Sequence, residues 1–350
     1  MSAIATPALP SRRAISFGPW ARTALGGAAL FAGAIVVGRR IDFSALTTAQ
    51  IAWGWIAASL LLNLASILGK AVVWKITLEA LPEGRRTRYA HVVPALFIGF
   101  LLNTVLFARV GELARIAVLA RRTRLADRPL TKKAITGTVI AEQLLVGAAL
   151  AITVLVLLVT CDLPPLATRL AFALIALIAV GSVLLYAVAR SARGRMRSFV
   201  DGIVEGNAVF TRPGAVALAL AAGTASWIAQ IAGIWAALVA FDIHAGLKGA
   251  ALVFVATTIV QLFPFWPGNV GMFQLGVYAP LVQLCAVPGS TAIAFGVGLQ
   301  VVEALLGVGL GLVFLAREGL TFGGARSLAG DDEVRLAVPR NAPAPATMSV

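Results

Sequence analysis

Apolar runs alternate with short polar segments along almost the whole chain. They lie at about residues 20–38, 51–69 (continuing in helical pattern towards 81), 92–107, 112–120, 134–160, 166–189, 215–241, 249–263, 272–286 and 290–316. A helix needs about 20 apolar residues to cross a bilayer. Six runs reach that length, whereas four are short and come in two adjacent pairs. The pattern predicts an all-α polytopic membrane protein with about six transmembrane helices.

The composition agrees with a membrane protein. Hydrophobic residues make up 59% of the 350 and charged residues only 13%, whereas a soluble globular chain carries roughly 25% charged residues. So few charges cannot cover a soluble surface, which excludes a soluble enzyme and a disordered chain. The net charge of +14 does not indicate nucleic-acid binding, because the basic residues lie in short loops between apolar spans.

The distribution of Lys and Arg predicts the orientation. The N-terminal arm, 82–91, 121–133, 190–213 and the tail after 316 hold 21 of the 29 basic residues. Cytoplasmic loops are rich in Lys and Arg. We therefore expect these five segments, and with them both termini, on the cytoplasmic side of a cytoplasmic (inner) membrane.

This orientation predicts two opposed re-entrant helical hairpins. Because 82–91 and 121–133 lie on the same side, the chain between them must enter the membrane and return, and 249–286 does so from the opposite face. Pro and Gly near the middle of each pair favour a turn there. In the alternative interpretation, 92–120 is one long tilted span and 249–286 forms two ordinary short spans, which places a strongly basic loop on the wrong side.

An internal similarity predicts that the hairpins belong to an inverted repeat. Residues 109–112 (Arg-Val-Gly-Glu) resemble residues 269–272 (Asn-Val-Gly-Met), and a span with a single glutamate follows each, Glu142 and Glu303. Inverted repeats are common in transporters, whose substrate sites lie near the bilayer midplane between the halves.

The predicted organisation has three parts. Residues 1–19 form a cytoplasmic arm, residues 20–318 form the transmembrane domain, and residues 319–350 form a disordered cytoplasmic tail. The repeat halves span about 51–160 and 215–316.

Polar residues inside the apolar runs are the candidate site. A charge near the bilayer centre costs about 2.5–3.5 kcal/mol on insertion scales and tends to mark function. Arginine side chains and helix N-termini both bind phosphate. The candidate substrate-binding residues are Asn103, Arg109, Gly111, Glu112, Arg115, Glu142, Gly268, Asn269, Gly271, Gln274 and Glu303.

These residues have two interpretations. Arg115 follows Glu112 by one helical turn, close enough to pair. In the functional interpretation Arg109 and Arg115 hold a lipid phosphate, and Glu112 and Glu142 pair with them when the site is empty. In the structural interpretation these charges pair only to hold the fold, and Glu303 is a neutral, hydrogen-bonded carboxyl. Both interpretations can describe one network.

A second charged group, Lys70, Lys75 and Glu79, lies towards the inner end of the second span. Long side chains near a span end extend their charges to the interface. We expect all three to reach the cytoplasmic interface in this way.

The sequence contains no catalytic signature. It has no Ser/His/Asp set, no phosphate-binding loop and no H-E-x-x-H motif, and its two cysteines and two histidines are too few for a metal centre of the usual kinds. We expect no enzymatic activity, no metal and no cofactor.

Residues 97–115 (FIGFLLNTVLFARVGELAR) resemble the signature of the lysylphosphatidylglycerol synthase/flippase transmembrane family, as do Glu142 and residues 267–271 (PGNVG). The resemblance covers about residues 20–318. This family includes the membrane half of the multiple peptide resistance factor. The resemblance implies a flippase-like protein that handles membrane lipids. The family's synthase activity resides in a separate soluble domain, which we expect this chain to lack.

Three positions depart from the family pattern. The family usually has Pro where Phe107 stands, Arg where Gln143 stands and Glu where Gln274 stands. The last two changes remove one charge of each sign. This preserves the charge balance but argues against transferring specificity for lysyl lipids.

Two functions remain as the main hypotheses. In the first, the protein translocates an anionic phospho- or glycolipid headgroup between the hairpins. In the alternative, it is a non-catalytic accessory that presents a lipid to an enzyme of envelope-lipid or hopanoid biosynthesis. A transferase with its chemistry in the membrane and a small-solute or ion transporter are weaker hypotheses. A homodimer is compatible with each.

Overall fold

A computed structural model describes residues 52–82, 84, 87–105, 110–125, 130–161, 163–191, 206–262 and 267–319. Within these ranges the chain forms helices and their connections, with no strand. The predicted N-terminal arm and the first predicted span, 20–38, lie outside the described residues. So does the predicted disordered tail, apart from its first residue.

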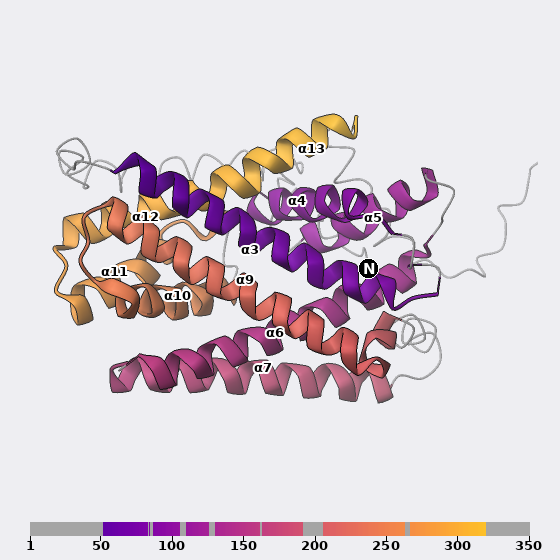
Figure 1. The fold of residues 1–350 in the computed structure, drawn as a ribbon, viewed down its shortest axis with the longest axis horizontal. Helices are drawn as coiled ribbons and strands as arrows, with labels where there is room; N and C mark the ends of the chain where they lie inside the picture. The colour runs from indigo at the N-terminus through magenta and orange to yellow at the C-terminus, as the bar shows by residue number, and fades with distance from the viewer. Residues whose placement is uncertain are drawn as a thin grey trace, which may run out of the picture. The chain divides into compact units, whose positions relative to one another are not determined.

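Figure 1 shows the order of the helices along the chain. They are α3 (Trp53–Glu79), α4 (Tyr89–Val105), α5 (Val110–Leu125), α6 (Lys132–Thr160), α7 (Pro165–Ser191), η2 (Asn207–Thr211), α9 (Pro213–Ala240), α10 (Gly246–Leu262), η3 (Pro267–Asn269), α11 (Met272–Cys285), α12 (Gly289–Ala304), η4 (Leu305–Leu310) and α13 (Gly311–Arg317). The first set, α3 to α6, and the second set, α9 to α13, have similar lengths in the same order. Helices α3 to α6 have 27, 17, 16 and 29 residues. Helices α9, α10 and α11 and the continuous helix Gly289–Arg317 have 28, 17, 14 and 29.

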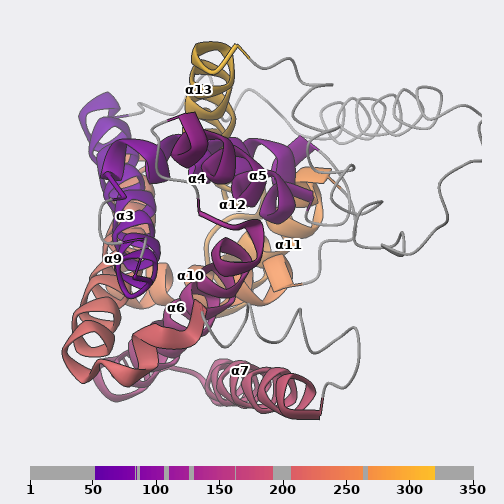
Figure 2. The same ribbon diagram turned by 90° about the vertical axis from the view of Figure 1, so that its right-hand side faces the viewer.

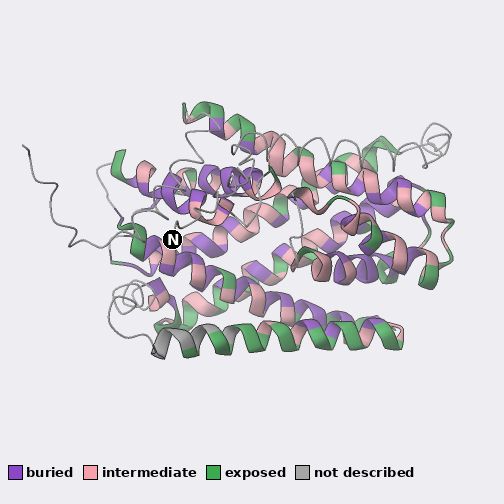
Figure 3. Ribbon diagram, turned by 180° about the vertical axis from the view of Figure 1, so that it is seen from behind, coloured by how far each residue is buried: buried purple, intermediate pink, exposed green. Residues whose placement is uncertain are grey.

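Four helices in the described part of the chain are long and apolar enough to cross a membrane. They are Trp53–Glu79, Lys132–Thr160, Pro213–Ala240 and Gly289–Arg317. Helix α7, a fifth predicted span, carries exposed apolar side chains such as Leu166, Phe172 and Leu177, and it is the largely exposed lowest helix of Figure 3. Large exposed apolar surfaces are rare on soluble monomers, so this face fits a lipid environment.

Helices α3 and α9 pack antiparallel along their whole length, and lie side by side in Figures 1 and 2. At one end the N–H of Ala52 donates to the carbonyl of Ala240 at 3.1 Å. At the other end Nη1 of Arg212 donates to the carbonyl of Glu79 at 3.3 Å. Small residues let such helices approach closely: a methyl group on Gly69 would lie 3.0 Å from the Cβ of Ser226.

The short helices form two antiparallel pairs, α4 with α5 and α10 with α11. A methyl group on Gly111 of α5 would lie 2.0 Å from the carbonyl oxygen of Gly99 of α4, and one on Gly276 of α11 would lie 3.2 Å from a methyl of Val260 of α10. Since α4 and α5 run back along each other, residues 92–120 are not one continuous span. The prediction of paired short helices is correct to this extent.

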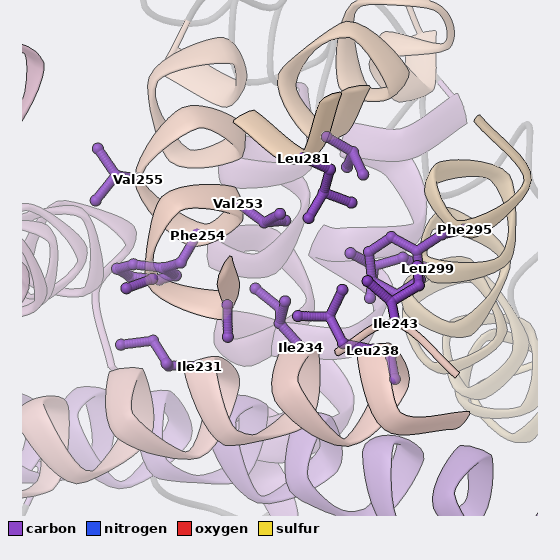
Figure 4. Close-up of a cluster of buried hydrophobic side chains, with 14 of the residues drawn as sticks. Ile231, Ile234, Leu238, Ile243, Val253, Phe254, Val255, Leu281, Phe295 and Leu299 are labelled. Carbon is purple, nitrogen blue, oxygen red and sulfur yellow. The ribbon is translucent and has the colours of Figure 1, made fainter. Parts of the chain in front are cut away.

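Apolar cores hold each set of helices together. In the second set, Ile234, Leu238, Phe254, Leu281 and Phe295 pack together from α9, α10, α11 and α12 (Figure 4). In the first set, a separate cluster joins α3, α4, α5 and α6. The candidate site lies beside this cluster of the first set, between α3, α4, α5 and α6.

Candidate functional site

Arg115 joins two glutamates inside the protein. Its Nη2 lies 2.7 Å from Oε2 of Glu112 and 2.8 Å from Oε2 of Glu142. Arg115 and Glu142 are each only 3% exposed, and Glu112 is partly buried. The predicted pairing of Glu112 with Arg115 along one helix is confirmed. Because Glu142 comes from α6, the same arginine also ties the α4–α5 pair to a long helix.

Asn103 of α4 extends this network to the N-terminus of α5. Its Nδ2 donates to Oε1 of Glu112 at 3.3 Å, and its Oδ1 accepts from the N–H of Gly111 at 2.8 Å. Glycine is required at 111, because a side chain there would collide with Asn103 and with the backbone of Gly99. The N–H of Gly111, a candidate substrate-binding residue, is therefore already occupied by Asn103.

An aromatic ring supports the buried guanidinium. Arg115 lies over Trp74 of α3, with 4.9 Å between its Cζ and the ring centroid. The indole N–H of Trp74 donates to Oγ1 of Thr138 at 3.3 Å. The charge of Arg115 is thus compensated by two carboxylates and a ring face. Both carboxylates contact Nη2, while the buried Nε of Arg115 has no hydrogen-bond partner among the described residues.

The second group of candidate residues forms the turn before α11. Oε1 of Gln274 accepts from the N–H of Gly271 at 2.5 Å, and its Nε2 donates to Gln300 of α12. Nε2 of Gln300 in turn donates to the carbonyl of Gly268 at 2.7 Å. Gly268 and Gly271 have φ of 67° and 88°, a conformation that favours glycine. A chain of amides therefore fixes this turn.

The turn before α11 reaches the end of α4. Helix η3 packs against α4, and a methyl group on Gly268 would lie 3.8 Å from the carbonyl oxygen of Thr104. Nδ2 of Asn269 donates to the carbonyl of Val260 at 3.3 Å, while its buried Oδ1 has no hydrogen-bond partner among the described residues. The two groups of candidate residues thus approach each other through Thr104, which follows Asn103.

Glu303 makes no hydrogen bond or ion pair with the Arg115 network in the described part of the chain. It lies at the middle of the helix Gly289–Arg317, 14 residues from either end. The charge that it interacts with is Lys70 of α3, which also interacts through space with Glu142.

The expectation that Lys70 reaches the cytoplasmic interface is wrong. Its Nζ donates to Oε1 of Gln230 at 3.1 Å and lies 4.0 Å from the ring centroid of Trp227, both on α9. Lys70 is nine residues before the end of α3, about 14 Å at 1.5 Å per residue, which is beyond the reach of its side chain. Lys75 and Glu79, nearer that end, form a partly exposed ion pair with each other.

The site thus contains residues that the sequence analysis did not select. Trp74 and Gln230 are polar-tipped residues within apolar helices, and Gln300 lies three positions before Glu303. Their sequence signal is a polar group in an apolar run, which is the signal that identified Glu142. Arg109 and Phe107 lie at 106–109, outside the described residues.

Comparison with known proteins identifies the family. The family model described as the lysylphosphatidylglycerol synthase TM region matches residues 24–311. No curated protein and no solved structure matches the chain. The match covers most of the chain. The apolar helices of the chain indicate an integral membrane protein. The chain belongs to the family of lysylphosphatidylglycerol synthase transmembrane regions.

Proposed function

We propose that this protein is a flippase-like carrier, which moves the phosphate-bearing headgroup of an anionic lipid across the inner membrane while the acyl chains stay in the bilayer. The observation that supports this most is the buried network of Arg115, Glu112 and Glu142. Charged residues inside membrane helices are rare and tend to line substrate routes. The family match adds that the chain is of a kind associated with lipid.

An inverted repeat provides the route. The two sets of four helices share an order of long, short, short and long, and their first members, α3 and α9, run antiparallel. We propose six spans with α4–α5 and α10–α11 as re-entrant hairpins that enter from opposite faces. In such proteins the substrate site lies between the repeats, and one repeat moves against the other.

Exchange of partners provides the binding step. A lipid phosphate that approaches Arg115 replaces Glu112, the more exposed of its two carboxylates, so the buried guanidinium is never left uncompensated. Removing a partner from a buried ion pair without replacement costs about 3–5 kcal/mol. Arg109, next to α5 in the chain, is proposed to meet the phosphate first.

Lipid movement in proteoliposomes tests the proposal. Fluorescent phosphatidylglycerol, a fluorescent zwitterionic phospholipid and a fluorescent polyprenyl phosphate are incorporated separately, and dithionite quenching reports transfer between leaflets. We expect transfer above that of protein-free vesicles, and its loss in Arg109→Ala and Glu142→Gln. Lys75→Gln is the matched control, because it removes a charge from the partly exposed pair with Glu79 and leaves the Arg115 network intact.

The outcomes separate the two main functions. Transfer that is lost in both site variants and kept in Lys75→Gln supports a carrier and identifies its headgroup class. If folded wild-type protein moves none of the three lipids, the carrier function is wrong, and the accessory function, tested by co-purification with a lipid-synthesis enzyme, takes its place.

A further inference from the structure

Lys70 is an interior cation that contacts no carboxylate of the described residues. Among the described residues no carboxylate oxygen lies within 4.0 Å of its Nζ. Its direct partners are the amide oxygen of Gln230 and the ring of Trp227. An ammonium group has three N–H donors. The amide uses one, and donor capacity remains for an anion.

Neutral polar groups surround this ammonium at the crossing of α3 and α9. Ser66 lies one turn before Lys70, with its hydroxyl oxygen 3.4 Å from Oε1 of Gln230 and 3.5 Å from the hydroxyl oxygen of Ser226. Glu303 and Glu142 attract Lys70 from a greater distance. Both glutamates therefore act on Lys70 through space and not by contact.

Glu303 belongs to a helix with an irregular backbone. The segment Leu305–Leu310, which begins two residues after Glu303, is π-helical, whereas α6, which carries Glu142, is α-helical from Lys132 to Thr160. Short π-helical segments inside α-helices are frequent at functional sites. The π-helical segment thus lies next to Glu303, the carboxylate on which the charge of Lys70 acts.

We propose that Lys70, with Gln230 and Ser66 beside it, forms a second binding site that takes the phosphate of a lipid headgroup. The inference rests on the proposed function and adds a phosphate contact at Lys70 to the one proposed at Arg115. An ammonium–phosphate contact is a charge-assisted hydrogen bond, about twice as strong as a neutral one. Two carboxylates already compensate the charge of Arg115 by direct contact, whereas no carboxylate of the described residues contacts Lys70.

The position of Lys70 fits a site shared by both halves of the protein. Lys70 and Gln230 are 160 positions apart, as are Ser66 and Ser226. Equivalent positions of the two sets of helices therefore meet here, and Lys70 is the charged member of its pair with Gln230. Substrate sites of inverted repeats lie at this kind of interface.

Binding of short-chain lipids to the detergent-purified full-length protein tests the assignment. Dihexanoyl phosphatidylglycerol is compared with dihexanoylglycerol, which has the same chains and no phosphate, by isothermal titration calorimetry. We expect Lys70→Gln and Lys70→Met to weaken binding of the phosphate lipid by about tenfold or more and to leave dihexanoylglycerol unchanged. Lys70→Arg, which keeps the charge, and Lys75→Gln, the matched control, retain binding of the phosphate lipid.

Each other outcome overturns the assignment. If wild-type protein binds the phosphate lipid and both neutral variants bind it equally well, the phosphate site lies elsewhere and the proposed function stands. Lys70 is a structural residue if Lys70→Gln and Lys70→Met either do not fold or lose binding of both lipids alike, and Lys70→Arg also loses binding of both lipids. If wild-type protein neither binds the phosphate lipid nor moves lipid in vesicles, the proposed function and this inference both fail.

Discussion

Ser66 of α3 and Ser226 of α9 meet with their hydroxyl oxygens 3.5 Å apart, although 160 positions separate them in the chain. Gly111 and Gly271, which precede Glu112 and Met272 at the start of α5 and α11, are separated by the same 160 positions. Both glycine N–H groups donate to a side-chain amide oxygen. A residue that contacts its own equivalent lies on a two-fold axis, which favours a two-fold relation between the two sets of helices.

Cysteines at the two serine positions test this crossing. In a background with Cys161 and Cys285 replaced by serine, Ser66→Cys with Ser226→Cys is expected to form a disulfide on mild oxidation, because the two side chains already touch. Mass spectrometry of tryptic peptides detects the bond. Ser59→Cys with Ser226→Cys is the control and is expected to stay reduced, because seven residues along α3 amount to about 10 Å. Equal cross-linking of both pairs would contradict the described helix register.

Removing Glu142 is expected to destabilise the protein strongly. Glu142→Leu takes away one carboxylate of a buried guanidinium, and breaking a buried pair costs about 3–5 kcal/mol. Arg115→Leu combined with Glu142→Leu is expected to unfold at a higher temperature than Arg115→Leu alone, because it leaves no unpaired carboxylate on α6. Thermal unfolding in detergent measures both effects.

The exposed ion pair of α3 supplies the comparison for this prediction. Lys75 and Glu79 have side chains that are 28% and 39% exposed, and such pairs contribute about 0–1 kcal/mol. Lys75→Gln is therefore expected to leave the melting temperature almost unchanged. A double variant whose loss of stability equals the sum of the two single losses would show that Arg115 and Glu142 do not stabilise each other.

Gly111→Ala is expected to separate α4 from α5. Its methyl group would lie 2.0 Å from the carbonyl oxygen of Gly99 and 2.5 Å from Oδ1 of Asn103, and forced overpacking costs about 1–3 kcal/mol or more. We expect a lower melting temperature and reduced lipid movement. Gly181→Ala in α7, where nothing lies within 4 Å of the added methyl, is expected to be neutral or slightly stabilising. Equal stability of the two variants would contradict the close approach of α4 and α5.

Labelling of single cysteines tests whether α4 and α5 form a re-entrant hairpin. Pro82→Cys, Lys133→Cys and His244→Cys are made separately in a background without Cys161 and Cys285, since all three positions are exposed. A membrane-impermeant maleimide applied to right-side-out and inside-out vesicles reports their side. We expect Pro82 and Lys133 on the cytoplasmic side and His244 on the other. Labelling of Pro82 and Lys133 from opposite sides would rule out the re-entrant arrangement.

The sequence by itself determined the helices and their lengths. Apolar runs of two lengths predicted long helices and adjacent short ones, because a helix must match the thickness of the bilayer that surrounds it. The pairing of Glu112 with Arg115 also followed from sequence, since residues three apart on a helix are neighbours. These are local relations, and periodicity and length are sufficient to reveal them.

The tertiary structure alone decided which distant polar groups meet. Lys70 was expected at the membrane surface, but it turns towards Gln230 and Trp227, and Gln300 of α12 holds the turn that contains Gly268. Apolar side chains tolerate many neighbours, whereas a buried polar group needs a particular partner with suitable geometry. That partner lies on a helix 26 to 160 positions away, and only the packing of the helices determines which one it is.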